Sequence, residues 1–463
     1  MLKLDPDILR AYDIRGVVGQ NLDTRIAFAV GRAFATIAFN RLGRAPQFCS
    51  AYDGRISSPD LEEAMVAGMC QSGAEVLRLG LGPTPMLYFA VTTLNRDGGV
   101  MVTGSHNPPE YNGFKLMFGC LPFWDEDILE LGDLVNSESF VSKPGSCRRS
   151  SKERGYVNRL VQEYDSDRGL SVVWDPGNGS AGRVLRNLTE ILPGHHQILN
   201  EEIDGRFPSH HPDPTVATNL AQLIDEVKIW NADLGIAFDG DGDRIGVVDH
   251  RGKIVWGDQL LTIYAQDLLR ELPGASIIAD VKSSTVFFEE VKKWGGNPIM
   301  WRTGHSPIKK KMAESGALLA GEMSGHIFFG DRYYGFDDAL YAAVRLLRLL
   351  AKTDLSLADL CDGLPKTVFT PEIRFACEEK AKFKIVEKVR KAVESRSGVQ
   401  VNDIDGVRVT TEDGWWLLRA SNTQPVLVAR CESWNDEGLQ RLKSELYEVL
   451  TEQGIKPPIL KVF

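Results

Sequence analysis

Three stretches of the sequence repeat one pattern, a short apolar run that ends in a polar loop containing glycine. The apolar runs cover residues 100–102, 236–238 and 318–320, and the loops after them begin at Thr103, Asp239 and Gly321. Such runs, alternating with helical patterns such as the one over 26–38, predict an α/β layer fold. Strand ends carry the chemistry in these folds, and three similar endings indicate three similar α/β domains.

The C-terminal part of the chain follows a different pattern. Val407 and Val409 alternate with polar residues, Asp413-Gly414 predicts a tight turn, and a further strand is expected over 426–430. The helix expected after it has an apolar inner face made of Leu439, Leu442, Leu446, Val449 and Leu450. This order predicts an α+β unit. Candidate joints between domains lie near residue 150, at 250–252 and at 365–371.

The 463-residue chain has 53 basic and 63 acidic residues and a net charge of −10, which argues against binding to nucleic acid or to an acidic membrane surface. An anionic ligand therefore needs a local basic pocket. The N-terminus has no apolar signal segment, no run approaches about 18 apolar residues, and the seven cysteines form no CxxC pair. These features predict a cytoplasmic protein without membrane or nucleic-acid partners, and nothing in the sequence requires more than a monomer.

The strongest chemical signal is Asp239-Gly240-Asp241-Gly242-Asp243-Arg244. Three carboxylates at alternate positions, separated by glycines that allow tight curvature, can turn their oxygens toward one hard cation, and magnesium is the expected ion. A calcium EF-hand is excluded because Arg244 and His250 stand where that loop needs glycine and glutamate. The remaining alternative is a solvated acidic turn, which the mutual repulsion of three carboxylates disfavours.

Three further loops carry weaker signals. Thr103-Gly104-Ser105-His106-Asn107-Pro108 presents the hydroxyl of Ser105 on a turn, and serine becomes a nucleophile when a base or a metal activates it. Glu322 and Ser324 point the same way from an extended loop and suit adjacent sugar hydroxyls. A fourth loop between two strands can cradle a phosphate with Arg419, Ser421, Asn422 and Thr423. Taken singly, each loop is also compatible with an ordinary polar turn, and His326 with a surface imidazole.

In this order, the four loops together resemble those of the α-D-phosphohexomutase family, and the resemblance covers the whole chain. It extends to Ala11-Tyr12-Asp13-Ile14-Arg15-Gly16, Tyr111-Asn112-Gly113-Phe114-Lys115 and Arg302-Thr303-Gly304-His305-Ser306. The resemblance implies three similar mixed α/β domains and a C-terminal α+β domain around a central cleft. With the joints above, we expect domains at 1–150, 151–253, 254–367 and 368–463. In that order they would carry the phosphoserine, metal, sugar and phosphate loops.

The resemblance also implies a role for each loop. Ser105 would carry the phosphoryl group, and the phosphoserine would bind Mg²⁺ together with Asp239, Asp241 and Asp243. Glu322 and Ser324 would hold sugar hydroxyls, and the phosphate that does not react would be held by Arg419, Ser421, Asn422 and Thr423. Other residues match positions that line the family's cleft: Tyr12, Arg15, Lys115, Arg244, Lys282, His305 and His326. One stretch departs from the family, because Ala51-Tyr52-Asp53-Gly54-Arg55 has Tyr52 in the place of an arginine.

The reaction expected from the resemblance interconverts the 6- and 1-phosphates of mannose and glucose through phosphoSer105 and a 1,6-bisphosphosugar, with glucose 1,6-bisphosphate as activator. Arg244 would stabilise the charge of the transferring phosphoryl group, and Arg15 is placed among the catalytic residues with it. His326 or Lys115 would take the proton of the sugar hydroxyl. Both sugars should react, because a sugar that is bound at O3 and O4 can reverse in the cleft without a specific contact to O2, and glucose and mannose differ only at that position. The alternatives are a phosphoglucosamine mutase, a non-catalytic phosphosugar-binding relative and a phosphatase.

Overall fold

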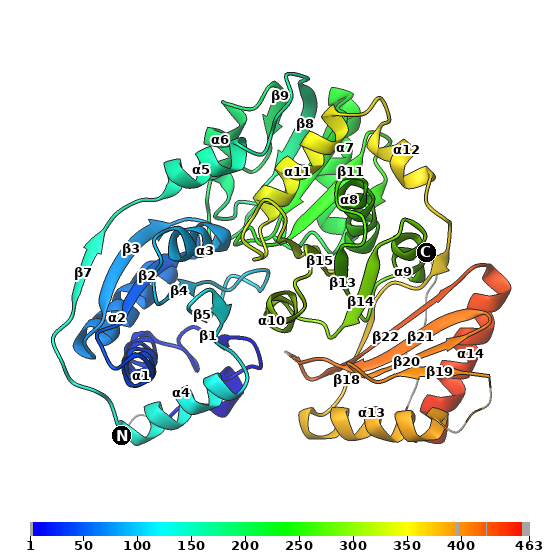
Figure 1. Cartoon of the computed structure of the whole chain (residues 1–463). Coiled ribbons are helices and arrows are strands. Elements are labelled where there is room, and N and C mark those ends of the chain that lie inside the picture. The colour runs from blue at the N-terminus through cyan, green and yellow to red at the C-terminus, as the bar shows by residue number, and fades with distance from the viewer. Residues whose placement is uncertain (1–2, 395, 397, 423, 456–463) are drawn as a thin grey trace.

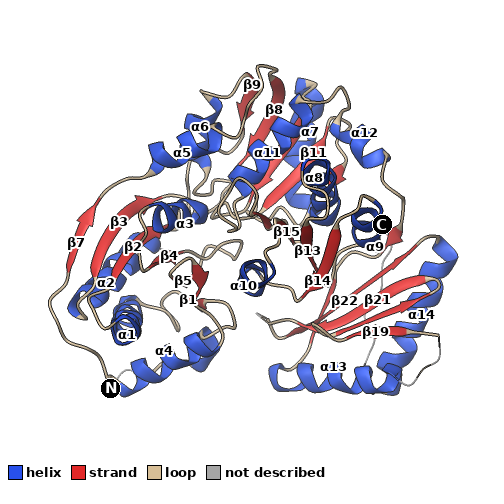
Figure 2. Cartoon of the chain, in the orientation of Figure 1, coloured by secondary structure: helices blue, strands red, loops and turns tan. Residues whose placement is uncertain are grey.

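The computed structural model describes residues 3–394, 396, 398–422 and 424–455, and these residues form four β-sheets with helices packed against them (Figures 1 and 2). The four units built on these sheets follow one another around an arc in chain order, so that the first and the fourth lie at its ends (Figure 1). The α/β fold class with a C-terminal α+β unit is thereby confirmed.

The first unit contains a mixed sheet in the strand order β1-β5-β4-β2-β3-β7, with β6 paired to β5. Its strands are β1 (Ile14–Val17), β2 (Gln47–Tyr52), β3 (Glu75–Leu81), β4 (Gly98–Val102), β5 (Tyr111–Phe118), β6 (Leu121–Pro122) and β7 (Ser146–Arg149). Its helices are η1 (Pro6–Ile8), α1 (Thr24–Leu42), α2 (Ser58–Gln71), α3 (Thr84–Thr93) and α4 (Glu126–Ser137). The α1 helix starts where the Asp23 side chain accepts a hydrogen bond from Ile26 N (2.9 Å), and it ends at Gly43 with a φ of 69°.

The second and third units have smaller sheets, in the orders β12-β11-β10-β8-β9 and β14-β13-β15-β16. The second unit consists of α5 (Glu153–Val161), β8 (Leu170–Asp175), α6 (Gly182–Thr189), β9 (Gly194–Ile198), η2 (Ala217–Leu220), α7 (Ala221–Trp230), β10 (Leu234–Phe238), β11 (Ile245–Asp249) and β12 (Ile254–Val255). The third consists of α8 (Gly257–Glu271), β13 (Ser276–Asp280), α9 (Thr285–Lys293), β14 (Asn297–Trp301), α10 (His305–Ser315), β15 (Leu319–Gly321), β16 (Ile327–Phe329), α11 (Ala339–Ala351) and α12 (Leu357–Asp362). Because β12 pairs with β11, the second sheet runs two residues past the joint expected at 253.

The fourth unit has a different, antiparallel sheet in the order β17-β22-β21-β20-β19, with β18 also paired to β22. Its elements are β17 (Val368–Phe369), β18 (Ile373–Ala376), α13 (Glu379–Glu394), β19 (Gln400–Asn402), β20 (Val407–Thr411), β21 (Gly414–Ala420), β22 (Val426–Ser433) and α14 (Asp436–Glu452). The predicted hairpin and the predicted inner face of the last helix are confirmed, since the five apolar residues of that face are all buried.

One feature is common to the first three units. Each has a polar loop between a strand in the parallel part of the sheet and the next strand, which returns beside it in the antiparallel sense. These are the serine loop (103–110, between β4 and β5), the aspartate loop (239–244, between β10 and β11) and the glutamate loop (322–326, between β15 and β16). In the fourth unit, the arginine loop is the stretch 419–425, which comprises the last two residues of β21 and the connection to β22.

One hydrophobic cluster spans the first three units, in addition to clusters that lie within each of them. It includes residues of α3 from the first unit, Trp174 and Phe238 from the second, and residues of α8 and α11 from the third. The whole of α11 is buried, and it packs against α5, β11 and β16. The three loops are therefore held in a common frame. The fourth unit has its own core and meets the third through Trp415, Leu417 and Val281. No helix in the described part of the chain is long and apolar enough to cross a membrane.

Candidate active site

The loops of the four units meet at a cleft of about 400 Å³. Most of the predicted site residues line it: Tyr12, Arg15, Arg244, Lys282, His305, Glu322, Ser324, His326, Arg419, Ser421 and Asn422. Arg10 and Arg374 add further cationic groups, so the acidic chain has the local basic pocket that an anionic ligand requires. Ser105, Lys115 and the three predicted metal-binding aspartates are buried. Thr423 lies outside the described residues.

Ser105 has an unusual backbone conformation. Its φ is 50°, in the left-handed region, which costs a residue with a side chain about 1–3 kcal/mol. The backbone N–H of Ser105 donates to Thr103 Oγ1 (2.8 Å), and the Ser105 hydroxyl donates to Asp239 Oδ2 (2.8 Å) and lies 3.2 Å from His106 Nδ1. The residue is 2% exposed. The serine hydroxyl of the first unit thus points at the aspartate loop of the second.

The aspartate loop gathers three fully buried carboxylates. One oxygen from each of Asp239, Asp241 and Asp243 lies within 4.8 Å of the others. Burial and the two neighbouring carboxylates raise the pKa of Asp239 well above its usual range. Oδ1 of Asp241 and Oδ1 of Asp243 have no hydrogen-bond partner among the described residues. Buried, mutually repelling carboxylates with free oxygens are the donor set that a hard divalent cation fits.

Glycine is required at both intervening positions of this loop. A Cβ atom at Gly240 would lie 2.6 Å from the carbonyl oxygen of Ser105, and Gly242 has a φ of 72°. The serine and aspartate loops can therefore approach this closely only because position 240 has no side chain.

Lys115, on β5, is the counter-charge of the aspartates. Its Nζ donates to Asp241 Oδ2 (2.7 Å) and to Asp243 Oδ2. Burial disfavours the charged amine, but the carboxylates of Asp241 and Asp243 outweigh burial and raise the pKa of Lys115 well above its usual value. Thr84 Oγ1 also donates to Asp241. The amine is charged in this arrangement, so its nitrogen has no free electron pair.

His326 lies in a chain of polar contacts between Asp337 and Arg244. Arg244 Nε donates to His326 Nε2 (3.0 Å), so Nε2 carries the electron pair and the proton is on Nδ1. His326 Nδ1 lies 3.0 Å from Asp337 Oδ2 and 3.6 Å from Asp243 Oδ1. Lys309 donates to the other oxygen of Asp337 (2.9 Å). The carboxylate of Asp337 thus lies beside Nδ1 of a histidine whose Nε2 faces the Arg244 guanidinium.

The glutamate loop presents a carboxylate to the cleft. Glu322 Oε1 accepts a hydrogen bond from Gly304 N (2.5 Å), and Oε2 accepts one from Ser324 Oγ (2.7 Å). Each oxygen keeps a lone pair for a further donor. His305 starts α10 beside this loop, and burial, followed by the charge of Lys309, lowers its pKa well below the usual value. His305 is therefore a neutral imidazole.

The arginine loop is tied to the first and third units. Asp405 pairs with the Arg419 guanidinium (3.0 Å) and also accepts a hydrogen bond from Thr303 N (2.9 Å). Asn422 Nδ2 donates to Tyr12 Oη (2.7 Å), and Tyr12 Oη donates to Thr303 O (2.8 Å). These contacts bring residues from three units to one edge of the cleft.

Two further cations of the cleft have acidic partners. The arginine loop also has a hydrogen bond between two of its own residues. Lys282 pairs with Glu372 (3.0 Å), Arg15 pairs with Asp13 (2.7 Å), and Ser421 Oγ accepts a hydrogen bond from Gln424 N (3.2 Å). The structure thus brings together every predicted site residue that it describes.

Sequence reasoning missed the residues that hold these groups in place. Asp337, Asp405 and Glu372 lie within ion-pair distance of predicted site residues, but each is a single carboxylate outside any motif. Asp53 and Arg55 contact the serine loop. Both belong to the stretch 51–55, in which Tyr52 replaces an arginine of the family, and that stretch was the sequence signal that could have marked them. Tyr52 packs against the apolar core of the first unit and supplies no charge in place of the family's arginine.

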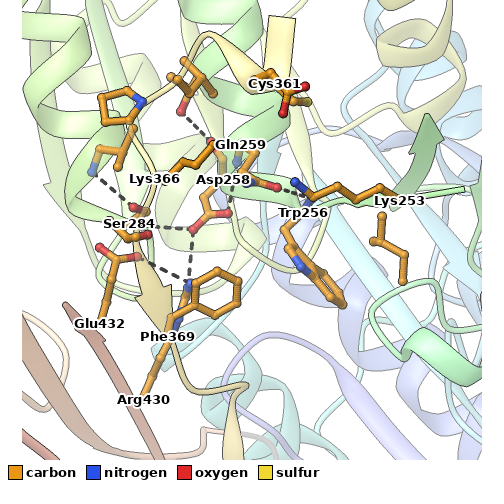
Figure 3. Close-up of a pocket in the computed structure, with 17 residues that line it drawn as sticks. Lys253, Trp256, Asp258, Gln259, Ser284, Cys361, Lys366, Phe369, Arg430 and Glu432 are labelled. Atoms are coloured by element: carbon orange, nitrogen blue, oxygen red, sulfur yellow. Dashed lines mark hydrogen bonds and ion pairs between the residues drawn. The ribbon is translucent and has the colours of Figure 1, made fainter. Parts of the chain in front are cut away.

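A second cavity, of about 250 Å³, lies where the third and fourth units meet and is lined by other residues (Figure 3). There Arg430 pairs with Asp258 (3.4 Å) and donates to the carbonyl oxygen of Lys282 (2.6 Å). The polar contacts around this cavity therefore join β22 to the segment that carries Lys282.

Comparison with known proteins agrees with this geometry. Family models of phosphoglucomutase/phosphomannomutase match α/β/α domain I at 6–141, domain II at 154–252, domain III at 256–368 and the C-terminal domain at 372–449. A phosphomannomutase/phosphoglucomutase of Pseudomonas aeruginosa PAO1 is 43% identical over 441 residues, which cover 95% of each chain. A phosphoglucomutase of Neisseria gonorrhoeae is 41% identical over 453 residues, which cover 97% of this chain and 98% of the relative.

Solved structures show the same likeness. The crystal structure of a phosphoglucomutase/phosphomannomutase family protein from Burkholderia thailandensis matches with a TM-score of 0.91 at 40% identity, over 99% of both chains. An N-acetylphosphoglucosamine mutase from Aspergillus fumigatus shares the fold, with a TM-score of 0.63 at 15% identity.

The fold and the site define an enzyme that transfers a phosphoryl group within a phosphosugar, a phosphohexomutase. Within that class, the chain belongs to the phosphoglucomutase/phosphomannomutase family of α-D-phosphohexomutases.

Proposed function

We propose that this phosphohexomutase interconverts the 6- and 1-phosphates of glucose and of mannose, with Ser105 as the residue that carries the phosphoryl group. The observation that carries the proposal is the contact between Ser105 Oγ and Asp239 Oδ2 (2.8 Å), within a buried cluster of three carboxylates beside a cation-lined cleft. A module that only binds phosphosugars needs neither the buried hydroxyl nor the three carboxylates.

Asp239, Asp241 and Asp243 would hold Mg²⁺, with an oxygen of phosphoSer105 as a further ligand. The free buried oxygens of Asp241 and Asp243 support this assignment. The ion would withdraw charge from the phosphoryl group, whose loose transition state spreads negative charge over three oxygens. Arg244 and Arg15, which line the cleft, would stabilise the same charge from the solvent side.

Phosphoryl transfer also requires a base for the sugar hydroxyl. In the forward half-reaction the bond between phosphorus and Ser105 Oγ breaks, a bond between phosphorus and the sugar oxygen forms, and the hydroxyl proton goes to His326 Nε2. The tautomer of His326 supports this role, because its Nε2 has the electron pair and Asp337 faces Nδ1. Arg244 Nε occupies Nε2 in this structure, so the proposed role requires the guanidinium to turn from Nε2 toward a phosphoryl oxygen when the sugar binds. Lys115 is the weaker candidate because it is charged and paired with two carboxylates.

The second half-reaction uses the same groups on the other end of the sugar. The 1,6-bisphosphosugar reverses in the cleft, the other phosphoryl group returns to Ser105, and the proton returns from His326 to the sugar oxygen that loses phosphorus. Glucose 1,6-bisphosphate would act as an activator because it can phosphorylate Ser105. In both orientations the phosphate that does not react would lie against Arg419, Ser421, Asn422 and Thr423, with Lys282, Tyr12 and His305 beside it.

Glu322 and Ser324 would receive the O3 and O4 hydroxyls, which exchange places when the sugar reverses. Because glucose and mannose differ only at C2, a site that grips O3 and O4 accepts both. The free lone pairs of the Glu322 carboxylate support this grip.

Intact-mass measurement and a mutase assay test the proposal together. Wild type incubated with glucose 1,6-bisphosphate and Mg²⁺ should gain one phosphoryl group and convert glucose 1-phosphate and mannose 1-phosphate to the 6-phosphates, whereas Ser105→Ala should do neither. Glucosamine 6-phosphate serves as the comparison substrate. A marked preference for it, or phosphosugar binding without isomerisation by the wild type, would overturn the assignment.

A further inference from the structure

A fully buried arginine that the mechanism above does not use lies directly behind the serine loop. The side chain of Arg55 has no exposed surface. A guanidinium has five N–H donors, and here all five have an acceptor. Nε donates to Asp53 Oδ2 (3.2 Å), and the two terminal nitrogens donate to the carbonyl oxygens of Ser105 (2.8 Å), Asn107 (2.6 Å), Pro108 (2.5 Å) and Tyr111 (2.9 Å).

Asp53 completes the contact with the loop from its other side. Its Oδ2 accepts hydrogen bonds from Thr103 Oγ1 (2.8 Å) and from Gly104 N (3.2 Å). Thr103 Oγ1 in turn accepts the hydrogen bond from Ser105 N. The pair Asp53 and Arg55 therefore holds the N–H of Ser105 through Thr103 and the carbonyl of Ser105 directly.

The same arginine packs against the second unit. Its guanidinium lies 5.1 Å from the ring centre of Phe207, and a Cβ atom at Gly205 would lie 2.5 Å from its Cα. On the opposite side, a Cβ atom at Gly104 would lie 2.4 Å from its Cζ. Arg55 thus fills the space between the serine loop and the unit that carries the aspartates.

We propose that Arg55 is a positioning residue for phosphoryl transfer, which holds Ser105 in its left-handed conformation so that the hydroxyl points at Asp239. The inference rests on the proposed function. Three carbonyl acceptors in the serine loop and a fourth at Tyr111, the first residue of β5, fix the path of the backbone from 105 to 111. This path compensates for the unfavourable φ of Ser105. Arg55 does not line the cleft, so it acts through the backbone of Ser105 and not through contact with substrate.

Lysine cannot replace this arginine. Its ammonium has three donors and no planar fork, so at least two of the five acceptors lose their hydrogen bond. We therefore expect the charge to be kept and the position of the loop to be lost in Arg55→Lys. A displacement of about 1 Å at a reacting group can cost about 100-fold in rate.

The experiment compares Arg55→Lys with Arg78→Lys. Arg78 is a matched control because it also pairs with a buried carboxylate of the first unit, Glu62, but does not touch the serine loop. We expect kcat of Arg55→Lys to fall about 100-fold with KM for glucose 1-phosphate unchanged, because Arg55 does not line the cleft in which the sugar would bind. Phosphorylation of Ser105 by glucose 1,6-bisphosphate, followed by intact mass, should slow by a similar factor. Arg78→Lys should keep the wild-type kcat, whatever its loss in melting temperature.

A second variant covers the case in which Arg55→Lys does not fold. Thr103→Val removes the hydroxyl that links Asp53 to Ser105 N and leaves Arg55 in place, and it should lower kcat in the same way with KM unchanged. A kcat of Arg55→Lys that equals that of Arg78→Lys, or a loss carried by KM, would overturn the positioning role. If Arg55→Lys does not fold, a kcat of Thr103→Val equal to that of the wild type would overturn the positioning role. Absence of mutase activity in the wild type would instead overturn the proposed function.

Discussion

Glu322→Gln tests how the sugar is gripped. The carboxylate accepts hydrogen bonds from Gly304 N and from Ser324 Oγ, one at each oxygen. The amide of glutamine can preserve both contacts if its carbonyl faces Gly304 N and its NH₂ group faces Ser324 Oγ, because a hydroxyl also accepts. The substitution therefore removes the negative charge and one acceptor directed at the sugar while the loop keeps its shape.

The size of the effect follows from the hydrogen bonds that are lost. A hydrogen bond to a charged group contributes about 1.5–3 kcal/mol, which corresponds to about 10- to 150-fold in kcat/KM. Because O3 and O4 have the same configuration in glucose and mannose, kcat/KM should fall by the same factor for both sugar phosphates. Ser324→Ala removes a neutral partner and should cost about 0.5–1.5 kcal/mol, or about 2- to 12-fold.

A coupled assay in which enzymatic oxidation of the 6-phosphate product reduces NADP⁺ to NADPH, run with glucose 1-phosphate and with mannose 1-phosphate, measures both factors. The melting temperature of Glu322→Gln should stay close to that of the wild type. If Glu322→Gln changed the ratio of the two kcat/KM values by more than about tenfold, O2 would be read at this carboxylate and the O3/O4 argument would be wrong. An unchanged kcat/KM for both sugars would exclude Glu322 from the grip altogether.

Removal of divalent metal by EDTA should abolish mutase activity, and added Mg²⁺ should restore it. In thermal unfolding, Mg²⁺ should raise the melting temperature of the wild type but not that of Asp241→Asn. Asp405→Asn removes the charge that orients Arg419, so we expect KM for glucose 1-phosphate to rise by more than kcat falls in steady-state assays, and a change confined to kcat would contradict it. Burial alone would lower the pKa of His210, but the hydrogen bond and charge of Asp175, 2.8 Å from Nε2, outweigh it and raise that pKa. The stabilisation is complete below the ordinary pKa of about 6.5 and is lost as pH rises through the higher folded value, so His210→Asn should lower the melting temperature more at about pH 5.5 than at about pH 8. An equal loss at both pH values would refute the linkage.

Much of the fold and site was accessible from local patterns. The strand endings before Thr103 and Asp239, the ending predicted before Gly321 and found one residue later, and the inner face of the last helix are encoded in stretches of a few residues. In such stretches, hydrophobic period and loop composition suffice. The chemistry of each loop was equally local, since three alternating aspartates can be read without knowing where they lie.

Partners separated by long stretches of sequence were not accessible in this way. Glu372 pairs with Lys282, about ninety residues earlier, and Arg55 contacts a loop that begins about fifty residues later. Glu372 stands in no pattern that marks its role, and the stretch that contains Arg55 does not show which loop this arginine contacts. The spanning core was also not accessible. Each of the three units has a hydrophobic cluster of its own, but α11 is buried on all sides within a further cluster that spans all three units.

By itself, the sequence determined which residue types are available at each strand end, because backbone preferences and side-chain chemistry act over a few neighbouring positions. Only the tertiary structure decided that the hydroxyl of Ser105 and the carboxylate of Asp239 lie 2.8 Å apart although 134 positions separate them. That contact depends on the packing of the two units against each other and on a glycine at position 240 that lets their backbones approach. Such packing is a property of the whole folded chain, and no single segment contains it.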